Sequence, residues 1–321
     1  YLVNVKKMAI LRTSQTILAA KEESTYGSAA TLAGTDCLLV SNVNLNQVAG
    51  EPKERPNIRG FAGNFPTYPS NTKAELSFSL ELTPSGIAGQ RPDYDDLLLA
   101  CGLVCADTSS TNTYTPDPTL DDAISLTIAI LIDGTYHKIL GARGTFTIDL
   151  NTNDAPLVNF SFIGIYTDPV IVDSNNPQLT PSYTQLPPIA ANSSNTTNFA
   201  LHSYAGALSS FSYDHSNTLY YSELISGQKS TRITDRKPSG SLTIESVDLA
   251  TKNFYSIANS SATGNLTWKH GQSAGNQITF LASYTDLDTI SQEDNEGYQM
   301  LNMTYRALPS SGNDEMSLLF S

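Results

Sequence analysis

Runs in which apolar and polar residues alternate recur along the whole chain, and they predict β-strands. The clearest run is Ala74–Leu82, where the apolar residues share one face and the polar residues share the other. The same alternation predicts further strands at Cys37–Leu45, Ile124–Ile132, Thr135–Leu140, Thr145–Leu150, Leu157–Ile165, Leu208–Tyr213, Leu219–Leu224, Gly240–Ser246, Leu266–Lys269, Gln277–Ala282 and Gly297–Ala307. The pattern indicates an all-β protein.

Two segments depart from this alternation and predict short helices. Pro92–Gly102 has acidic residues in its first turn and glycine at its end, which suits the helix dipole and a left-handed terminal residue. Leu249–Asn259 is the second predicted helix. Asp133-Gly134 between two predicted strands is a strong signal for a hairpin turn. Broken or strongly polar segments predict three loops, at Glu51–Tyr68, Lys229–Pro238 and Asp286–Glu296.

One strand pattern occurs twice in different letters. Ser77–Glu81 returns as Ser241–Glu245, and later in each half Val158–Phe162 returns as Leu301–Tyr305. Matches in the same order favour a duplicated β domain, and a chain with two copies of one unit can fill two equivalent places in a symmetric ring. The alternative is that short alternating strands resemble each other by chance.

The duplication predicts a two-domain organisation. We expect an N-terminal arm over residues 1–30, with Ala9–Ala20 outside the core and a natural start at Met8. The first domain covers residues 31–167 and the second covers residues 199–321. Residues 168–198 are rich in Pro, Asn, Ser and Thr and are predicted to be the linker between the domains.

Composition supports this interpretation and excludes several classes of function. The chain has 321 residues, only 15% of them charged, and a formal net charge of −13. Proteins that hold nucleic acid use Lys and Arg to neutralise phosphates, so this charge argues against tight binding of DNA. No apolar run reaches the roughly 18 residues of a membrane helix, and we expect no membrane partner. Three cysteines without a visible secretory signal do not predict a disulfide framework.

No catalytic or metal-binding constellation can be assembled from the sequence. The histidines His137, His202, His215 and His270 are scattered, and none has a second ligand one helical turn away. The acidic segment Asp286–Glu296 lacks the alternating ligand spacing of a calcium loop. We therefore predict a protein that is not an enzyme and that binds no cofactor.

Four segments resemble the tail tube (major tail) proteins of long-tailed bacteriophages. They are Lys21–Gly27, Ile139–Gly144, Thr234–Ser241 and Leu308–Glu315. Together they span nearly the whole chain. The resemblance implies tube domains of β-sandwich or split-barrel type whose sheets join into one continuous inner β-barrel. With two domains per chain it implies trimeric rings of six-fold pseudosymmetry, stacked into a channel for double-stranded DNA.

The resemblance also implies partners and location. The chain would contact copies of itself and, at the ends of the tube, other tail proteins. DNA would pass through without specific binding. The protein would be made in the host bacterial cytoplasm and would belong to the virion tail.

The polar faces of the matched strands are then expected to line the channel. The expected lumen-facing residues are Glu75, Ser77, Ser79, Glu81, Asn159, Ser161, Ser241, Thr243, Glu245, Asn302 and Thr304. Any antiparallel strand with one solvent-exposed face shows this alternation, whether that face lines a channel or lies on the outside of the protein. The placement of these residues toward the channel therefore rests on the resemblance.

The basic loops are expected to reach the neighbouring ring, as the corresponding loops do in that family. The expected contacts between rings are Arg55, Arg59, Arg232, Arg236 and Lys237, with Asp286, Asp288 and Glu293 as their acidic partners.

Two other classes of protein could be built on β domains of this composition. A surface protein that binds a host receptor or glycan would also suit Ser-, Thr- and Asn-rich β domains. A β-sandwich hydrolase would need a catalytic cluster, which the sequence does not provide.

Overall fold

The computed structural model describes residues 16–120, 123–173 and 176–321. The expected start at Met8 and the first half of the expected arm lie outside these residues. The described chain consists mainly of antiparallel strands, with two short α-helices, α1 (Asp95–Ala100) and α2 (Phe254–Asn259), inside the segments predicted to be helical. The predicted all-β class with short helices is therefore confirmed.

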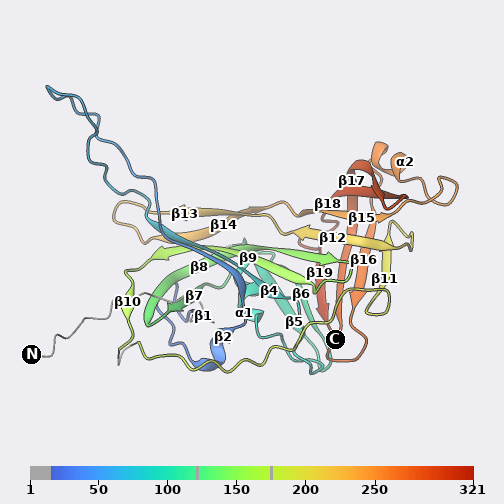
Figure 1. The fold of residues 1–321 in the computed structure, drawn as a ribbon, viewed down its shortest axis with the longest axis horizontal. Coiled ribbons are helices and arrows are strands. Elements are labelled where there is room, and N and C mark those ends of the chain that lie inside the picture. Colours follow the sequence, from blue (N-terminus) through green and yellow to red (C-terminus); the bar gives the residue numbers. More distant parts are fainter. Residues whose placement is uncertain (1–15, 121–122, 174–175) are drawn as a thin grey trace, which may run out of the picture.

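Eight strands, four from each half of the chain, follow one another in one continuous stretch (Figure 1), which we call the eight-strand sheet. In spatial order they are β3 (Ser41–Ala49), β4 (Lys73–Glu81), β9 (Leu157–Tyr166), β8 (Thr135–Asn151), β12 (Leu208–Asp214), β15 (Ser239–Glu245), β18 (Tyr298–Ala307) and β17 (Ile278–Asn295). Within the eight-strand sheet the halves of the chain join where β12 pairs with β8. Outside it, β19 (Ser317–Phe320) of the second half also pairs with β6 (Asn112–Pro116) of the first.

The strands that match in sequence also pair in the same register. In the first half, Phe78 lies opposite Phe160 in the β4–β9 ladder. In the second half, Leu242 and Met303, the counterparts of these two residues in the sequence match, lie opposite each other in the β15–β18 ladder. A slip of one residue would turn every side chain to the other face. The sequence repeat is therefore also a repeat of strand pairing.

Each half adds two strands in the same order. β7 (Leu126–Ile132) pairs with β8 and with β1 (Thr16–Glu22), and β16 (Gly264–His270) pairs with β17 and with β11 (Thr196–Leu201). β1 corrects the expectation that Ala9–Ala20 lies outside the core, because the described part of that segment is a paired strand with buried residues. The remaining strands of the large sheet are β2 (Cys37–Leu38), β5 (Leu103–Asp107), β6 (Asn112–Pro116), β10 (Val170–Ile171) and β19 (Ser317–Phe320).

The connections at equivalent places in the two halves differ. β3 and β4 are joined by residues 50–72, a long arm that projects from the body of the molecule (Figure 1). β12 and β15 are joined by a hairpin of β13 (Asn217–Ser222) and β14 (Ser230–Arg236), which lies along the first half. Lys229–Pro238, expected to be a loop, therefore consists mostly of β14. The expected acidic loop Asp286–Glu296 is likewise almost entirely part of β17.

Aromatic side chains fill one core that runs through both halves. Phe146 of β8 packs against Tyr213 of β12 with ring centroids 6.2 Å apart, so the core crosses the join between the halves. Phe211, Trp268 and Phe280 cluster on the second side of that join. Burial of large aromatic rings is a major source of stability in a β protein.

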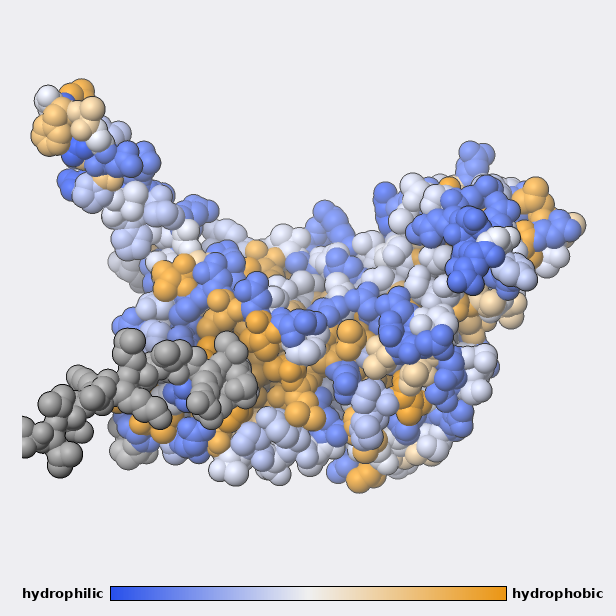
Figure 2. Space-filling model, viewed as in Figure 1, coloured by the Kyte–Doolittle hydropathy of each residue, from blue (hydrophilic) through white to orange (hydrophobic). Residues whose placement is uncertain are grey.

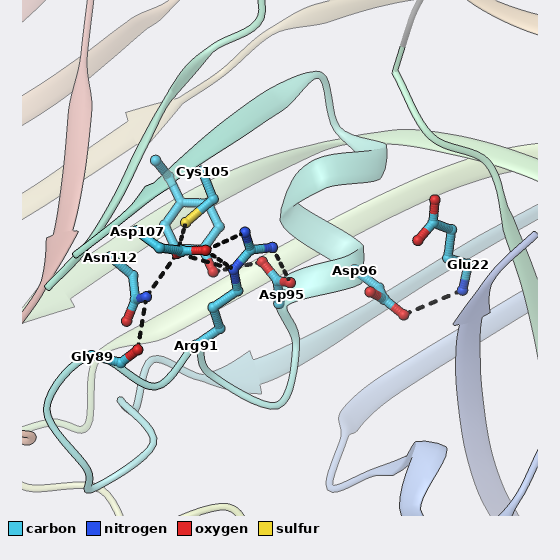
Figure 3. A network of polar contacts seen from close by, with 9 residues as sticks. Glu22, Gly89, Arg91, Asp95, Asp96, Cys105, Asp107 and Asn112 are labelled. Atoms are coloured by element: carbon cyan, nitrogen blue, oxygen red, sulfur yellow. Dashed lines mark hydrogen bonds and ion pairs between the residues drawn. The ribbon is translucent and has the colours of Figure 1, made fainter. Parts of the chain in front are cut away.

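Helix α1 is held by a polar network at its N-terminal end (Figure 3). Arg91 Nη1 lies 2.9 Å from Asp95 Oδ2, and Arg91 Nη2 lies 2.6 Å from Asp107 Oδ2. Asn112 Nδ2 donates a 2.8 Å hydrogen bond to Asp107 Oδ1. Hydrogen bonds from the Arg91 guanidinium and from Asn112 hold the pKa of Asp107 well below its usual value. The network fixes the helix against the β5–β6 hairpin.

Candidate functional site: a polar sheet face with two open edges

One face of the eight-strand sheet is polar along its whole width. Residues directly opposite each other in a ladder share a face, and this relation connects the polar positions from β3 to β17 without a break. All eleven residues expected to face a lumen lie on this surface, which we call the polar face. The opposite side of the same strands carries the buried aromatic and aliphatic residues.

The polar face contains residues that the sequence comparison did not select. They are Asn44 and Asn46 on β3, Thr145, Thr147 and Asp149 on β8, Ser210, Ser212 and Asp214 on β12, and Thr289 and Ser291 on β17. The repeat linked only two strands of each half, so the outer two strands of each set of four were missed. Alternation in Thr145–Leu150 and Leu208–Tyr213 was the available signal.

Hydrogen bonds tie neighbouring strands together across the polar face. Ser79 Oγ of β4 donates to Asn159 Oδ1 of β9 at 2.7 Å. Asn159 Nδ2 donates to Asp149 Oδ2 of β8 at 2.7 Å, and Ser212 Oγ of β12 donates to Asp149 Oδ1 at 2.7 Å. The chain of bonds crosses four strands and the join between the halves, and each Asp149 oxygen has its own donor.

A similar arrangement occurs at the far edge of the sheet. Asn302 Nδ2 of β18 donates to Glu293 Oε1 of β17 at 2.9 Å. Thr289 and Thr304, directly opposite each other, form a hydroxyl–hydroxyl contact of 2.6 Å. Glu293 was expected to contact a neighbouring ring, but the structure places it on the polar face with the expected lumen residues.

The polar face is acidic. Its carboxylates are Glu75, Glu81, Asp149, Asp214, Glu245, Asp286 and Glu293. Two basic side chains on it are already paired: Lys73 Nζ lies 2.9 Å from Glu75 Oε1, and Arg306 Nε lies 2.7 Å from Asp288 Oδ2. A phosphate near this surface would therefore encounter carboxylates, hydroxyls and amides. Lys73 and Arg306 of the surface are already paired with carboxylates of the same chain.

The sheet ends in two open edges. Within the described ranges, β3 pairs along one side only, with β4. Residues 288–295 of β17 also pair on one side only, with β18, within those ranges. Strands with unpaired N–H and C=O groups are templates for pairing with another chain.

The residues expected to contact a neighbouring ring lie on the projecting arm, on β14 and the residue after it, and on β17. Arg55 and Arg59 are on the projecting arm, and Arg232 is exposed on β14. Arg236 is buried, with Nη2 3.0 Å from Glu315 Oε1 of the same chain. Lys237 is paired with Asp235 at 2.9 Å. Within one chain these basic residues do not meet Asp286, Asp288 or Glu293.

The tip of the arm is apolar, which the sequence interpretation did not anticipate (Figure 2). Ile58 is fully exposed and Phe61 is 71% exposed. The Arg59 guanidinium lies over the rings of both Phe61 and Phe65, with centroid distances of 4.5 and 4.4 Å. Exposed apolar side chains at the end of a long arm are typical of a surface that becomes buried on assembly.

In residues 16–120, 123–173 and 176–321, no three His, Cys, Asp or Glu side chains gather as a metal site would require. Neither described helix has the length and apolar character needed to cross a bilayer. His215 is fully buried beside Tyr213 and Phe146, and burial, with the charge of Arg236, lowers its pKa to about 3. It is a neutral core residue at neutral pH.

Fold and site together define an all-β protein with a continuous polar face and two sheet edges open to further strands. The chain matches the family described as phage tail tube protein over residues 13–307. It belongs to that family, as the resemblance of its sequence segments implies, and it is a structural protein of the phage tail. No curated protein matches the chain.

Proposed function

We propose that this protein is the ring subunit of a long, non-enzymatic tail tube of a siphovirus, through which double-stranded DNA passes during ejection. Each half of the chain is one tail-tube domain, over residues 31–167 and 199–321, and β1 adds to the first domain as β11 adds to the second. Three chains form a ring of six domains, and rings stack into the tube. Newly made subunits assemble in the cytoplasm of the bacterial host, with other tail proteins at the two ends.

The observation that carries this proposal is the continuous polar face of the eight-strand sheet. A sheet of eight strands built from two equivalent sets of four suits a ring in which domains occupy similar places. Three such chains would supply a barrel of twenty-four strands. A barrel has no free edges, so closure would satisfy the backbone groups that one chain leaves open.

The acidity of the polar face supports its placement toward the DNA. Lys and Arg provide most of the affinity of proteins for nucleic-acid backbones. A wall of carboxylates and hydroxyls offers phosphates no partner, so a duplex would slide past it. Because salt screens charges beyond about 8 Å at physiological ionic strength, only residues on the wall itself would act on the DNA.

The arm and the β13–β14 hairpin support the proposed contacts between rings. They are the β3–β4 and β12–β15 connections, so they occupy equivalent places in the two halves. The apolar tip of the arm and the exposed charges Arg55 and Arg232 are available to a neighbour. Lys237 is also exposed, in a pair with Asp235. Arg236 is buried in a pair with Glu315 of the same chain, which supports a role in the stability of the subunit.

Negative-stain electron microscopy of the purified full-length protein tests the proposal. We expect annular particles or tubes with an axial channel, and native mass spectrometry of an isolated annulus should give three chains. Dispersed monomers that bind glycans on an array would support the alternative of a host-binding surface protein and would contradict the proposal.

A further inference from the structure

The join between the halves of the chain shows how two of its sheet edges pair. Within one chain, β12 lies antiparallel on β8, with Ser212 opposite Asp149 and Asp214 opposite Thr147. The Ser212–Asp149 hydrogen bond of 2.7 Å crosses this join. The join thus unites an outer strand of the second set of four with an outer strand of the first.

Each strand at this join has a counterpart in the other half. Ser212 of β12 lies opposite Ser241, and Asn44 of β3 lies opposite Ser77, the match of Ser241 in the repeat. β3 is therefore the counterpart of β12, and Asn44 is the counterpart of Ser212. Beyond Asn44 the same register makes Asn46 the counterpart of Asp214.

The same reasoning identifies the counterpart of β8. Thr147 lies opposite Asn159, and Ser291 of β17 lies opposite Asn302, the match of Asn159 in the repeat. Two residues further on, Asp149 corresponds to Glu293. β17 is therefore the counterpart of β8. β3 and the last part of β17 are the two strands that the described chain leaves open on one side.

We infer that β3 of one chain pairs antiparallel with β17 of a second copy of the chain, with Asn44 opposite Glu293 and Asn46 opposite Ser291. This inference rests on the proposed function and specifies the contact between neighbouring subunits. The contact joins two different surfaces, so successive copies add head to tail and close when the rotation completes a ring. The internal β12–β8 join is its template.

The side chain of Glu293 already makes one of the two hydrogen bonds that Asp149 makes at the internal join. Asp149 accepts one hydrogen bond from Asn159 within its half and one from Ser212 across the join. Glu293 accepts the first of these from Asn302, the counterpart of Asn159, at 2.9 Å. No donor among the described residues reaches its second oxygen, Oε2. Asn44 of the neighbouring copy, as the counterpart of Ser212, supplies an amide donor at that place.

Charge favours this pairing over pairing of two identical edges. The exposed end of β17 carries Glu293 and Asp294, so two β17 edges side by side would bring like charges together. β3, with the sequence SNVNLNQVA, has no charged side chain and several amide groups. It is exposed at alternate positions, including Asn44 and Asn46. An uncharged edge rich in amide donors complements an acidic edge.

Engineered disulfides test the register. Opposed residues in an antiparallel pair have Cα atoms about 4.5–5.5 Å apart, which lies within the range that a disulfide spans. All variants carry Cys105→Ser, because Cys105 is half-buried whereas the other two cysteines are buried. The test variant adds Asn44→Cys and Glu293→Cys to the full-length protein. Assembled particles are mildly oxidised and analysed by non-reducing electrophoresis and intact mass.

Two matched variants place cysteines near the proposed contact but out of its register, and so control for cross-linking by proximity alone. Asn44→Cys with Gln292→Cys places the second thiol on the opposite face of β17. Asn46→Cys with Glu293→Cys reports a register shifted by two residues. We expect the test variant to cross-link at least ten times faster than either control, and its largest covalent species should contain every chain of the ring. A mixture of the two single-cysteine variants should give covalent dimers only.

The outcomes separate this contact from the proposed function. Annuli or tubes in which the test variant stays uncross-linked, or in which the shifted pair reacts faster, would overturn the contact while leaving the tube function in place. A wild-type protein that forms neither annuli nor tubes would overturn the proposed function and the contact together.

Discussion

Ser212 of β12 and Asp149 of β8 face each other where the two halves of the sheet join, and Ser212 Oγ donates a hydrogen bond of 2.7 Å to Asp149 Oδ1. The other carboxylate oxygen of Asp149 accepts a 2.7 Å bond from Asn159 of β9. One side chain thus connects three strands, two from the first half and one from the second. Substitution of Asp149 therefore measures how much the join contributes to the stability of the subunit.

Asp149→Ala should destabilise the isolated subunit. Removing the carboxylate leaves two donors without their acceptor on a partly buried surface, and we expect a loss of about 2–3 kcal/mol in the free energy of unfolding by urea. Glu293→Ala is the matched control at the counterpart position. It should leave the unfolding of the subunit nearly unchanged and reduce the yield of assembled particles. Equal losses of subunit stability in the two variants would contradict the view that Asp149 acts within the chain and Glu293 between chains.

The buried ion pair of Arg236 with Glu315 predicts a strong, partner-dependent effect. Both side chains are more than 90% buried, so Arg236→Met leaves an uncompensated charge and should cost about 3–5 kcal/mol in unfolding free energy. The double variant with Glu315→Leu should recover most of that loss, which a double-mutant cycle would show. Lys237→Met, in the exposed pair with Asp235, should change stability little. If the losses of stability in the two single variants simply added in the double variant, Arg236 and Glu315 would not be coupled.

Acid should destabilise the subunit through His215. Its pKa in the folded protein is lowered to about 3 by burial and by Arg236, whereas the pKa of an unfolded histidine is about 6.5. Between these values the unfolded chain binds a proton that the folded chain does not, so stability falls as pH decreases from about 6.5 toward 3, by up to about 1.4 kcal/mol per pH unit.

His215→Phe should flatten this dependence. The ring already stacks on Phe146 with centroids 4.8 Å apart, so phenylalanine fits the shape, although Tyr213 loses a hydrogen-bond partner and stability at neutral pH falls. The measurement is the slope of unfolding free energy against pH from 6 to 4. His137→Gln, at a half-buried position, should change the slope less. A slope unaltered in the phenylalanine variant would show that His215 does not carry the effect.

Sequence patterns located most of the strands because one of their faces is buried. Ala74–Leu82 alternates strictly, and the structure buries its apolar face in β4. Asp133-Gly134 forms the predicted hairpin turn, with positive φ at both residues, +43° and +86°. Where local chemistry and burial agree in this way, the sequence is sufficient.

Two of the missed segments lack such agreement. The last part of β17 is exposed on both faces in the isolated chain, so no period of two appears, and its acidic residues suggested a loop. β1 has the opposite pattern, because Leu18 and Ala19 face different parts of the core and consecutive residues are buried. The polar face was found only in part for a related reason: the positions on β8 and β12 depend on a pairing between distant segments.

We expect the arm to be needed for assembly of the tube but not for folding of the subunit. Lys53 and Tyr68 exchange two backbone hydrogen bonds, of 2.9 and 3.0 Å, at its base. Residues 54–67 can therefore be replaced by Asn-Gly, which closes this pair as a two-residue hairpin. The shortened protein should unfold at nearly the wild-type temperature but form no tubes in electron micrographs. Ile58→Ser with Phe61→Ser keeps the length of the arm and tests its apolar tip. Normal tubes from the shortened protein would refute a role of the arm between rings.

The acidity of the polar face predicts how fast DNA leaves the particle. Glu81→Lys with Glu245→Lys places two cations per chain on that face, where phosphates of passing DNA would bind them and slow its movement. Phage carrying this variant should release the genome more slowly than wild type after triggering, measured by fluorescence of a DNA-binding dye. The delay should be largest at low salt and shrink as salt shortens the range of the charges. Glu22→Lys with Asp168→Lys makes the same change of charge at exposed positions outside the polar face and should not alter the rate. Tubes that assemble normally but release DNA at the wild-type rate at every salt concentration would place the polar face away from the channel.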